Sequence, residues 1–240
     1  MASVVRPRFH LFFAIALSAF AVVGFARTYY LRFLSDLPPM TNLVQIHGAV
    51  FTIWMVLFIA QMKLIAARRV DLHRKLGVAS ALFALLLVII GVLTVMATTI
   101  THRVSPTGLT PPQFSIVGFT TIGLFATFLA LGVACRRRTA LHKRFMMLAM
   151  ITVVGPAGSR LLKLLHLRDF GDWLLPLITV IFIGLCLAND WRREGRVHPV
   201  YALGGMLLLA SGPLSLMVGR SEWYRPFGDE VARIALGLFG

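Results

Sequence analysis

The chain has 240 residues, of which 58% are hydrophobic and only 14% charged, and its formal net charge is +15. Soluble domains carry about 25% charged residues, whereas here apolar runs of roughly 20 residues follow one another with short breaks, which excludes a water-soluble globular domain. The basic residues stand in short clusters between these runs, so the positive charge does not indicate a nucleic-acid-binding protein.

Seven apolar runs predict seven transmembrane helices, because a segment in lipid must pair its own backbone polar groups. The runs cover residues 9–26, 43–66, 76–100, 114–134, 145–162, 173–188 and 200–218. The first run follows Arg6 and Arg8 as a signal sequence would, but it is longer than the roughly 7–15 apolar residues of a signal peptide. The expected fold is an all-α integral membrane protein, a seven-helix bundle in one domain over residues 1–240.

Lysine and arginine are concentrated in alternate loops. The breaks after the second, fourth and sixth runs carry Arg68, Arg69, Arg74, Lys75; Arg136, Arg137, Arg138, Lys143, Arg144; and Arg192, Arg193, Arg196. This asymmetry predicts a cytoplasmic N-terminus and an outer C-terminus, although Arg160, Lys163 and Arg168 fall on the predicted outer side. Residues 225–240 predict a short interfacial helix. A bacterial inner membrane or plasma membrane is the expected location, with the lipid bilayer as the first partner.

A basic block with one histidine occurs twice in the chain. RRVDLHRKLG (68–77) and RRRTALHKRFM (136–146) align on His73 and His142, 69 residues apart, and each reads Arg-Arg-x-x-Leu-His followed by two basic residues. Each block stands between an even-numbered and an odd-numbered run. The duplication predicts that the two histidines lie at one depth near the cytoplasmic face, as two axial metal ligands would.

The seven histidines fall in two layers, with none in the middle of a run. His10, His73, His142 and His198 are expected at the cytoplasmic interface, and His47, His102 and His166 at the outer one. A histidine beside basic residues can also simply anchor a helix end at the interface, and for His10, His166 and His198 this role is favoured. The two cysteines, Cys135 and Cys186, indicate neither a disulfide framework nor a metal motif.

The second run carries an aromatic stripe. His47, Phe51, Trp54, Phe58 and Gln61 fall on one face of a helix. A histidine and a glutamine are costly to turn toward lipid, so this face is expected to point into the bundle. Such a stripe suits packing against other helices as well as packing against a haem edge.

The chemistry that remains is that of imidazole. The chain has no phosphate-binding, hydrolase or metalloprotease motif, and its nine acidic residues lie in loops or at helix ends. These features argue against a carboxylate proton relay and against a hydrolytic metal site. Two neutral imidazoles from different helices suit a six-coordinate haem iron, and copper is the other metal that imidazole suits.

The order of helices and histidines resembles the cytochrome b561 family over about residues 40–165. The resemblance rests on VQIHGAVF with His47, LHRKLG with His73, LHKRFM with His142 and TITHRV with His102. It implies a four-helix haem-binding core, a haem b held by His73 and His142 on the cytoplasmic side, and nearby basic residues that meet an electron donor. The blocks LHR-x-LG and LHKR also resemble uncharacterised bacterial multi-pass proteins, which implies no activity.

The chain departs from that family at the outer haem. PQFSIVGF (112–119), at the start of the fourth run, has no histidine where the family has its second outer ligand, and the interval of 26 residues from His47 to His73 is short. An outer centre would therefore need His102 or Gln113 as the partner of His47. One haem b is expected, and a second depends on this substitution.

Three functions follow as hypotheses. The first is a membrane-bound b-type cytochrome-like electron carrier or oxidoreductase, with a quinol or small anionic donor. Its haem propionates or donor would be met by Arg69, Arg74, Lys75, Arg138 and Lys143. The second is a non-catalytic accessory or assembly subunit of a larger membrane complex, whose small residues and kinked VVGPAGS (153–159) suit close helix packing. The third, a transporter, is disfavoured because the repeat is parallel and only one Gly-Pro break occurs.

Overall fold

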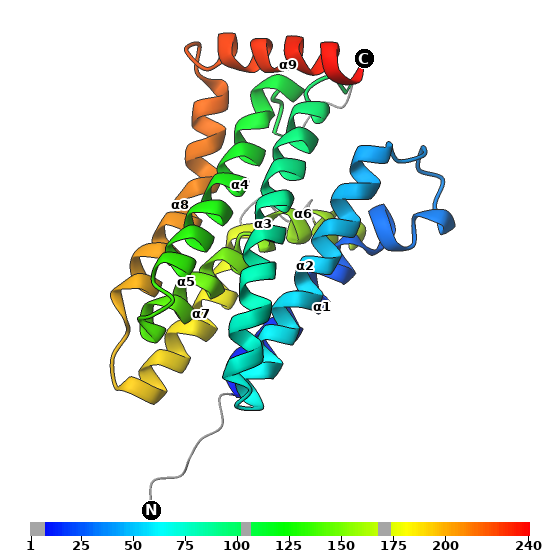
Figure 1. The fold of residues 1–240 in the computed structure, drawn as a ribbon. Coiled ribbons are helices and arrows are strands. Elements are labelled where there is room, and N and C mark those ends of the chain that lie inside the picture. The colour runs from blue at the N-terminus through cyan, green and yellow to red at the C-terminus, as the bar shows by residue number, and fades with distance from the viewer. Residues whose placement is uncertain (1–7, 102–106, 168–173) are drawn as a thin grey trace, which may run out of the picture. The chain divides into compact units, whose positions relative to one another are not determined.

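The protein is described by a computed structural model, which covers residues 8–101, 107–167 and 174–240, and every regular element in these ranges is helical. Figure 1 shows the helices in chain order. They are α1 (Arg8–Phe25), α2 (Asn42–Ala66), α3 (Val70–Thr98), α4 (Pro111–Ala134), α5 (Thr139–Ile151), α6 (Val154–Leu164), α7 (Leu174–Glu194), α8 (Pro199–Arg220) and α9 (Arg225–Phe239). The predicted all-α class is confirmed.

Seven of the described segments are long and apolar enough to cross a membrane, as predicted. In three of them the helix extends several residues beyond the apolar run through charged residues, whose long stems can reach the interface. Helix α3 begins at Val70 and α5 at Thr139, and α7 continues to Glu194. Several residues expected in loops therefore belong to terminal helical turns, which matters for the site below.

The fifth span is broken in the middle. It runs from Thr139 to Leu164 as two helices, α5 and α6, separated at Thr152 and Val153. Pro156 has no backbone N–H to give to the carbonyl of Thr152, and proline is tolerated only in the first turn of a helix, where it lies in α6. The kink predicted in VVGPAGS is confirmed.

The chain divides into two compact units, which we describe separately. The first comprises residues 1–87 and 154–175, and the second comprises residues 88–153 and 176–240, so that α3 contributes to both. The expectation of a single domain over residues 1–240 stays a prediction.

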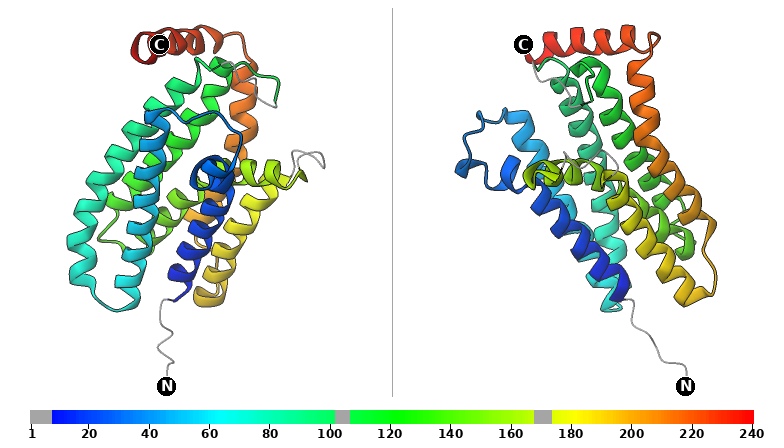
Figure 2. Two further views of the ribbon diagram at one scale, coloured as in Figure 1. Left: turned by 90° about the vertical axis from the view of Figure 1, so that its right-hand side faces the viewer. Right: turned by 180° about the vertical axis from the view of Figure 1, so that it is seen from behind.

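In the first unit, α1 packs against α6 and α2. The approach to α6 is close, because a Cβ on Gly24 would lie 2.5 Å from the carbonyl oxygen of Ala157. After α1 the chain continues in a π-helical turn, Ala26–Tyr30, and Tyr29 donates a hydrogen bond to the carbonyl of Gln45 at 3.0 Å. Together these contacts fix α1 against both neighbours. Figure 2 gives two further views of these helices.

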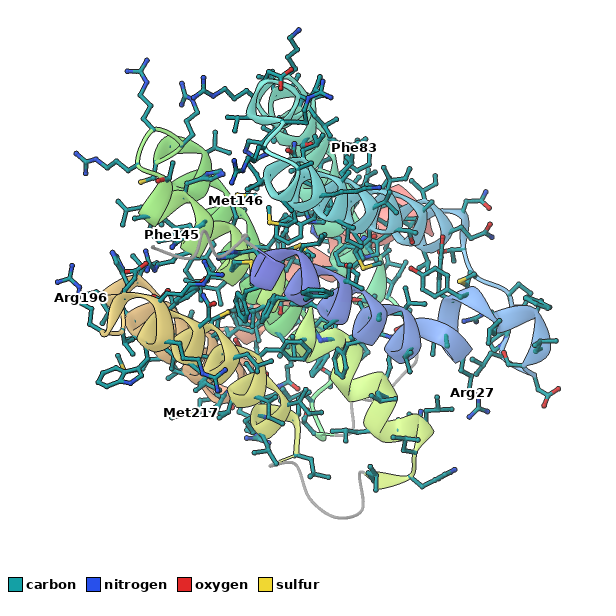
Figure 3. All side chains as sticks on the ribbon, turned by 90° about the horizontal axis from the view of Figure 1, so that it is seen from below. Arg27, Phe83, Phe145, Met146, Arg196 and Met217 are labelled. Atoms are coloured by element: carbon teal, nitrogen blue, oxygen red, sulfur yellow. The ribbon has the colours of Figure 1, made fainter. Side chains whose placement is uncertain are left out.

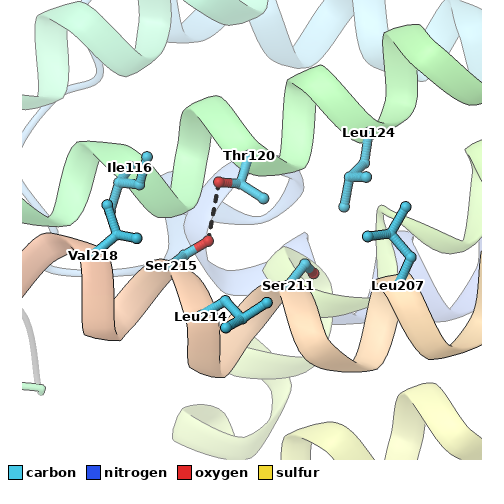
Figure 4. Close-up of a pocket in the computed structure, with 8 residues that line it drawn as sticks. All are labelled: Ile116, Thr120, Leu124, Leu207, Ser211, Leu214, Ser215 and Val218. Carbon is cyan, nitrogen blue, oxygen red and sulfur yellow. Dashed lines mark hydrogen bonds between the residues drawn. The ribbon is translucent and has the colours of Figure 1, made fainter.

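In the second unit, α4 is the central helix and packs against α5, α8 and α9. Thr110 and Gln113 form a capping box that starts α4. Between α4 and α8, Ser215 donates to Thr120 at 3.0 Å, and this bond spans a shallow apolar groove (Figure 4). Helix α9 lies across the ends of α4 and α8 (Figure 1), with Phe227 edge-on to Phe119. The predicted C-terminal helix is thus present.

Candidate functional site

The histidine of the second basic block is held by the end of α4. His142 lies in the first turns of α5, and its Nδ1 is 2.7 Å from the carbonyl oxygen of Gly132. That carbonyl belongs to the last turn of α4. The backbone N–H of Arg136, four residues further on, donates to the carbonyl of Val133 and not to that of Gly132. A carbonyl can only accept, so the proton of His142 is on Nδ1 and the lone pair of the neutral ring is on Nε2.

A glycine makes this bond geometrically accessible. A Cβ on Gly132 would lie 2.8 Å from Sδ of Met146 in α5, so a larger residue at this position would require the Met146 side chain to move. The side chains of Phe145 and Met146, the last two residues of the second basic block, are labelled in Figure 3. The packing of α4 on α5 therefore fixes the orientation of the His142 ring.

The histidine of the first block has a different partner. His73 lies in the first turns of α3, and the two ends of the buried Gln61 amide face its Nδ1 at 2.5 Å and the Oγ of Ser80 at 3.2 Å. Ser80 gives its only hydroxyl proton to the carbonyl of Leu76 at 2.8 Å, so it accepts from the amide nitrogen. In this orientation of the amide, its oxygen faces Nδ1 of His73.

The opposite orientation of the amide satisfies more neighbours. Its nitrogen would donate to Nδ1 and the backbone carbonyl of His73, at 2.5 and 3.2 Å, and its oxygen would accept from the backbone N–H of Gly77 at 3.0 Å. Because an amide can present either its oxygen or its nitrogen to an imidazole, Gln61 holds the His73 ring in place and suits either tautomer of that ring.

The aromatic stripe of α2 points inward for most of its length. Trp54 and Phe58 are each 2% exposed and Gln61 is 7% exposed, which confirms the predicted face. His47 and Phe51, nearer the start of α2, are half-buried and their rings stack with centroids 6.3 Å apart. The inner end of the stripe therefore contacts the His73 ring through Gln61.

The remaining predicted site residues are dispersed. Arg69 forms an exposed ion pair with Asp71 at 3.6 Å. The other basic residues predicted to meet the haem propionates or the donor, apart from Lys143, are exposed: Arg74, Lys75 and Arg138. His102 lies outside the described residues. Gln113 is engaged in the capping box of α4, where its Oε1 accepts from the backbone of Thr110 at 3.0 Å. The side-chain oxygen of Gln113 is thus used in capping α4.

The most deeply buried charge in the second unit was expected in a loop. Arg144 is 0% exposed, and its guanidinium makes a two-point contact with Asp190 of α7 at 2.8 and 2.9 Å. It also donates to Glu194 at 2.6 Å and to the carbonyl of Ala140 at 2.8 Å. Lys143 donates to the same Glu194 at 3.2 Å. We call Lys143, Arg144, Asp190 and Glu194 the α5–α7 clamp.

The clamp changes the interpretation of the duplicated block. Lys75, which aligns with Arg144, is exposed, so the two blocks differ at the second basic residue after the histidine. In the second block, His142 ties α5 to α4 while Lys143 and Arg144 tie it to α7. The signal available in the sequence was the pair Asp190 and Glu194, which are four residues apart and face the same side of a helix.

The start of α8 is joined to the clamp. The backbone N–H of His198 donates to Asp190 at 3.4 Å, and Nδ1 of His198 accepts from the backbone N–H of Val200 at 3.2 Å as the cap of α8. The ring of Tyr201 lies 5.8 Å from the Arg144 guanidinium carbon. Tyr201 is 1% exposed and its hydroxyl has no hydrogen-bond partner in the described part of the chain.

We expect the cap at His198 to make stability pH-dependent. Burial, with the nearby charge of Arg144 second, lowers the pKa of His198 from its ordinary 6.5. The unfolded chain therefore binds this proton at higher pH than the folded chain, so stability is present above about pH 6.5 and is lost as the pH falls through the folded value. A protonated ring also cannot accept from Val200.

The measurement is the thermal midpoint in detergent between about pH 7.5 and pH 5.5. The wild type should lose stability on acidification, and His198→Ser, which keeps a capping oxygen, should lose less. Equal slopes in the two proteins would contradict a role for His198.

Imidazole remains the donor chemistry of the site. In residues 8–101, 107–167 and 174–240, no group of three or more His, Cys, Asp and Glu side chains could hold a metal ion. A haem asks less of the chain, because the porphyrin supplies four nitrogens and only two axial ligands come from protein. His142, with its lone pair on Nε2, has the donor atom that such a ligand requires.

Comparison with known proteins gives no further identification. No protein-family model, no curated protein and no solved structure matches the chain. Function must therefore be argued from the residues themselves.

Proposed function

We propose that the protein is a membrane-embedded, b-type cytochrome-like electron carrier, with His142 and His73 as the axial ligands of a haem b. The observation that carries the proposal is the 2.7 Å contact between Nδ1 of His142 and the carbonyl of Gly132. Histidines that bind metals commonly donate their second N–H to a carbonyl or carboxylate, which fixes the ring and raises its basicity. The amide of Gln61 contacts Nδ1 of His73 at 2.5 Å and can present either its oxygen or its nitrogen to that ring.

The pairing of the two histidines comes from the duplicated sequence block. A haem supplies a reversible one-electron change, and the chain's residues would hold and tune it. Gly132 and Gln61 orient the two rings, and the clamp holds the first turns of α5 rigid on the side opposite α4. Because Arg144 is already satisfied by Asp190 and Glu194, its charge is compensated within the clamp.

The exposed basic residues of the blocks have a separate role in this proposal. Arg69, Arg74, Lys75 and Arg138 would neutralise haem propionates or receive a quinol or small anionic electron donor. Lys143 is engaged with Glu194 and contributes through the clamp. His47 and His102 stay predictions for an outer centre or an acceptor contact, in the inner or plasma membrane of the cell.

The test is an absorption spectrum of the purified full-length protein. Expressed with a haem supply and purified in mild detergent, it should show a b-type α-band in the reduced-minus-oxidised difference spectrum. Well-folded protein without that band would overturn the proposal. This measurement separates a cytochrome from a scaffold in one step.

One observation favours the alternative of an accessory subunit. The groove between α4 and α8 is lined by aliphatic side chains and by small hydroxyl residues, among them Ser211 and Ser215 (Figure 4). Small and hydroxyl residues are typical of helix–helix interfaces in membranes. Stable co-purification with a larger membrane complex, together with the absence of a chromophore, would support this function instead.

A further inference from the structure

One end of the second unit carries cations without matching acids. The end is formed by the C-terminal turns of α4 and α7 and the N-terminal turns of α5 and α8. Its two acidic residues are Asp190 and Glu194, and both are taken by Arg144 and Lys143. Both negative charges of this end are therefore compensated within the clamp, and the rest of its surface carries a net positive charge.

Five further cations at this end are exposed and are all arginines. They are Arg136, Arg137, Arg192, Arg193 and Arg196, and we call them the arginine surface. In the part of the chain that the structure describes, no carboxylate lies within 4.0 Å of them. Arg193 donates to the Asn189 amide oxygen at 3.1 Å, and Arg196 lies at the periphery of the view in Figure 3. Arg138, assigned above to the haem, is left out.

The chemistry of this surface suits phosphate. A guanidinium presents a planar fork of donors that matches two phosphate oxygens, whereas lysine acts as a point charge. The only lysine at this end, Lys143, is bound to Glu194. The exposed arginines of the arginine surface can therefore form oriented hydrogen bonds to phosphate oxygens, in addition to attracting the phosphate by their charge.

A tryptophan places the arginine surface at the depth of lipid headgroups. Trp191, next to Arg192 near the end of α7, is 64% exposed on a segment apolar enough to span the membrane. Exposed tryptophan at a helix end is typical of the membrane–water interface. The phosphates nearest the arginines are then those of the surrounding leaflet.

We propose that the arginine surface binds the phosphate groups of anionic phospholipids, and so retains a layer of these lipids around the α4–α5 and α7–α8 ends. The proposal is independent of haem binding. It requires that the clamp keep Asp190 and Glu194 away from the arginines, because a free carboxylate among them would compete with the lipid phosphate.

The experiment is a lipid titration of the full-length protein followed by native mass spectrometry. Phosphatidylglycerol should bind with an apparent affinity at least about tenfold above that of phosphatidylcholine, since the attractions of several cations to an anionic headgroup add together. Replacing Arg136, Arg137, Arg192, Arg193 and Arg196 by glutamine should abolish the difference. The five-lysine variant, which keeps the charge and the topology, should bind phosphatidylglycerol more weakly than wild type.

The matched control uses arginines at the other end of the same unit. Arg225 and Arg233 are exposed, but each is paired with a glutamate, Glu222 or Glu230. Arg225→Gln with Arg233→Gln should leave phosphatidylglycerol binding unchanged. Equal binding of the two lipids to wild type, full retention in the five-lysine variant, or complete competition by inorganic phosphate alone would each overturn the proposal, the last by indicating a soluble anion site.

Discussion

Replacing Arg144 by alanine should lower the free energy of unfolding by about 3–5 kcal/mol, the cost of leaving a buried charge without its partner. Asp190, which is 1% exposed, would lose both bonds from the guanidinium and keep only the long contact from the backbone of His198. The measurement is thermal or denaturant unfolding of the purified protein in a fixed detergent. Asp190→Ala should cost a similar amount for the same reason.

Two comparisons identify the cause of that loss. Lys143→Ala removes only a bond between side chains that are each about one-third exposed, and should cost about 1 kcal/mol or less. The double variant Arg144→Met/Asp190→Leu should lose less free energy of unfolding than the two single variants lose together, because it leaves no unpaired buried charge. Strict additivity of the single variants would contradict a direct pairing of the two residues.

Replacing His142 by alanine should abolish the b-type α-band, because the iron would lose one of its two axial ligands. His73→Ala should do the same. The readout is the reduced-minus-oxidised spectrum together with the haem content per chain. His198→Ala is a matched control at the same end of the second unit, and its band should be retained.

A second substitution separates ligation from helix capping. His142→Asn keeps a side-chain N–H that can donate to the carbonyl of Gly132 but offers no imidazole to a metal. The asparagine variant should therefore fold with nearly wild-type stability and still lack the band. A retained band would assign His142 to the structural role of completing the end of α4.

The number and order of the spans could be predicted because lipid imposes one length and one kind of backbone pairing on each. The roles of the charged residues could not. Apolar runs stop at the first charge, so Arg144 was placed in a loop, although the helix that contains it begins at Thr139 and buries it completely. Its partner Asp190 is 46 residues away, and no local pattern connects the two.

The candidate site was predictable to a different degree at each histidine. The repeat identified His73 and His142, and the inward face of α2 identified Gln61, whose burial is confirmed. The partner of His142 could not be found in this way, because it is a backbone carbonyl and carries no residue signature. The residue that carries this carbonyl is Gly132, and a single glycine in a membrane helix does not by itself predict a hydrogen bond to a histidine.

The clamp also determines when the chain can become stable during its synthesis. Arg144 enters the membrane region within a span of moderate apolarity that is largely covered by protein in the finished fold. Its counter-charges, Asp190 and Glu194, leave the ribosome only after dozens of further residues have been made. Until then the arginine must remain in contact with water or headgroups. Insertion of the fifth span should therefore be completed together with α7, so that a chain truncated before Asp190 is retained by membrane quality control.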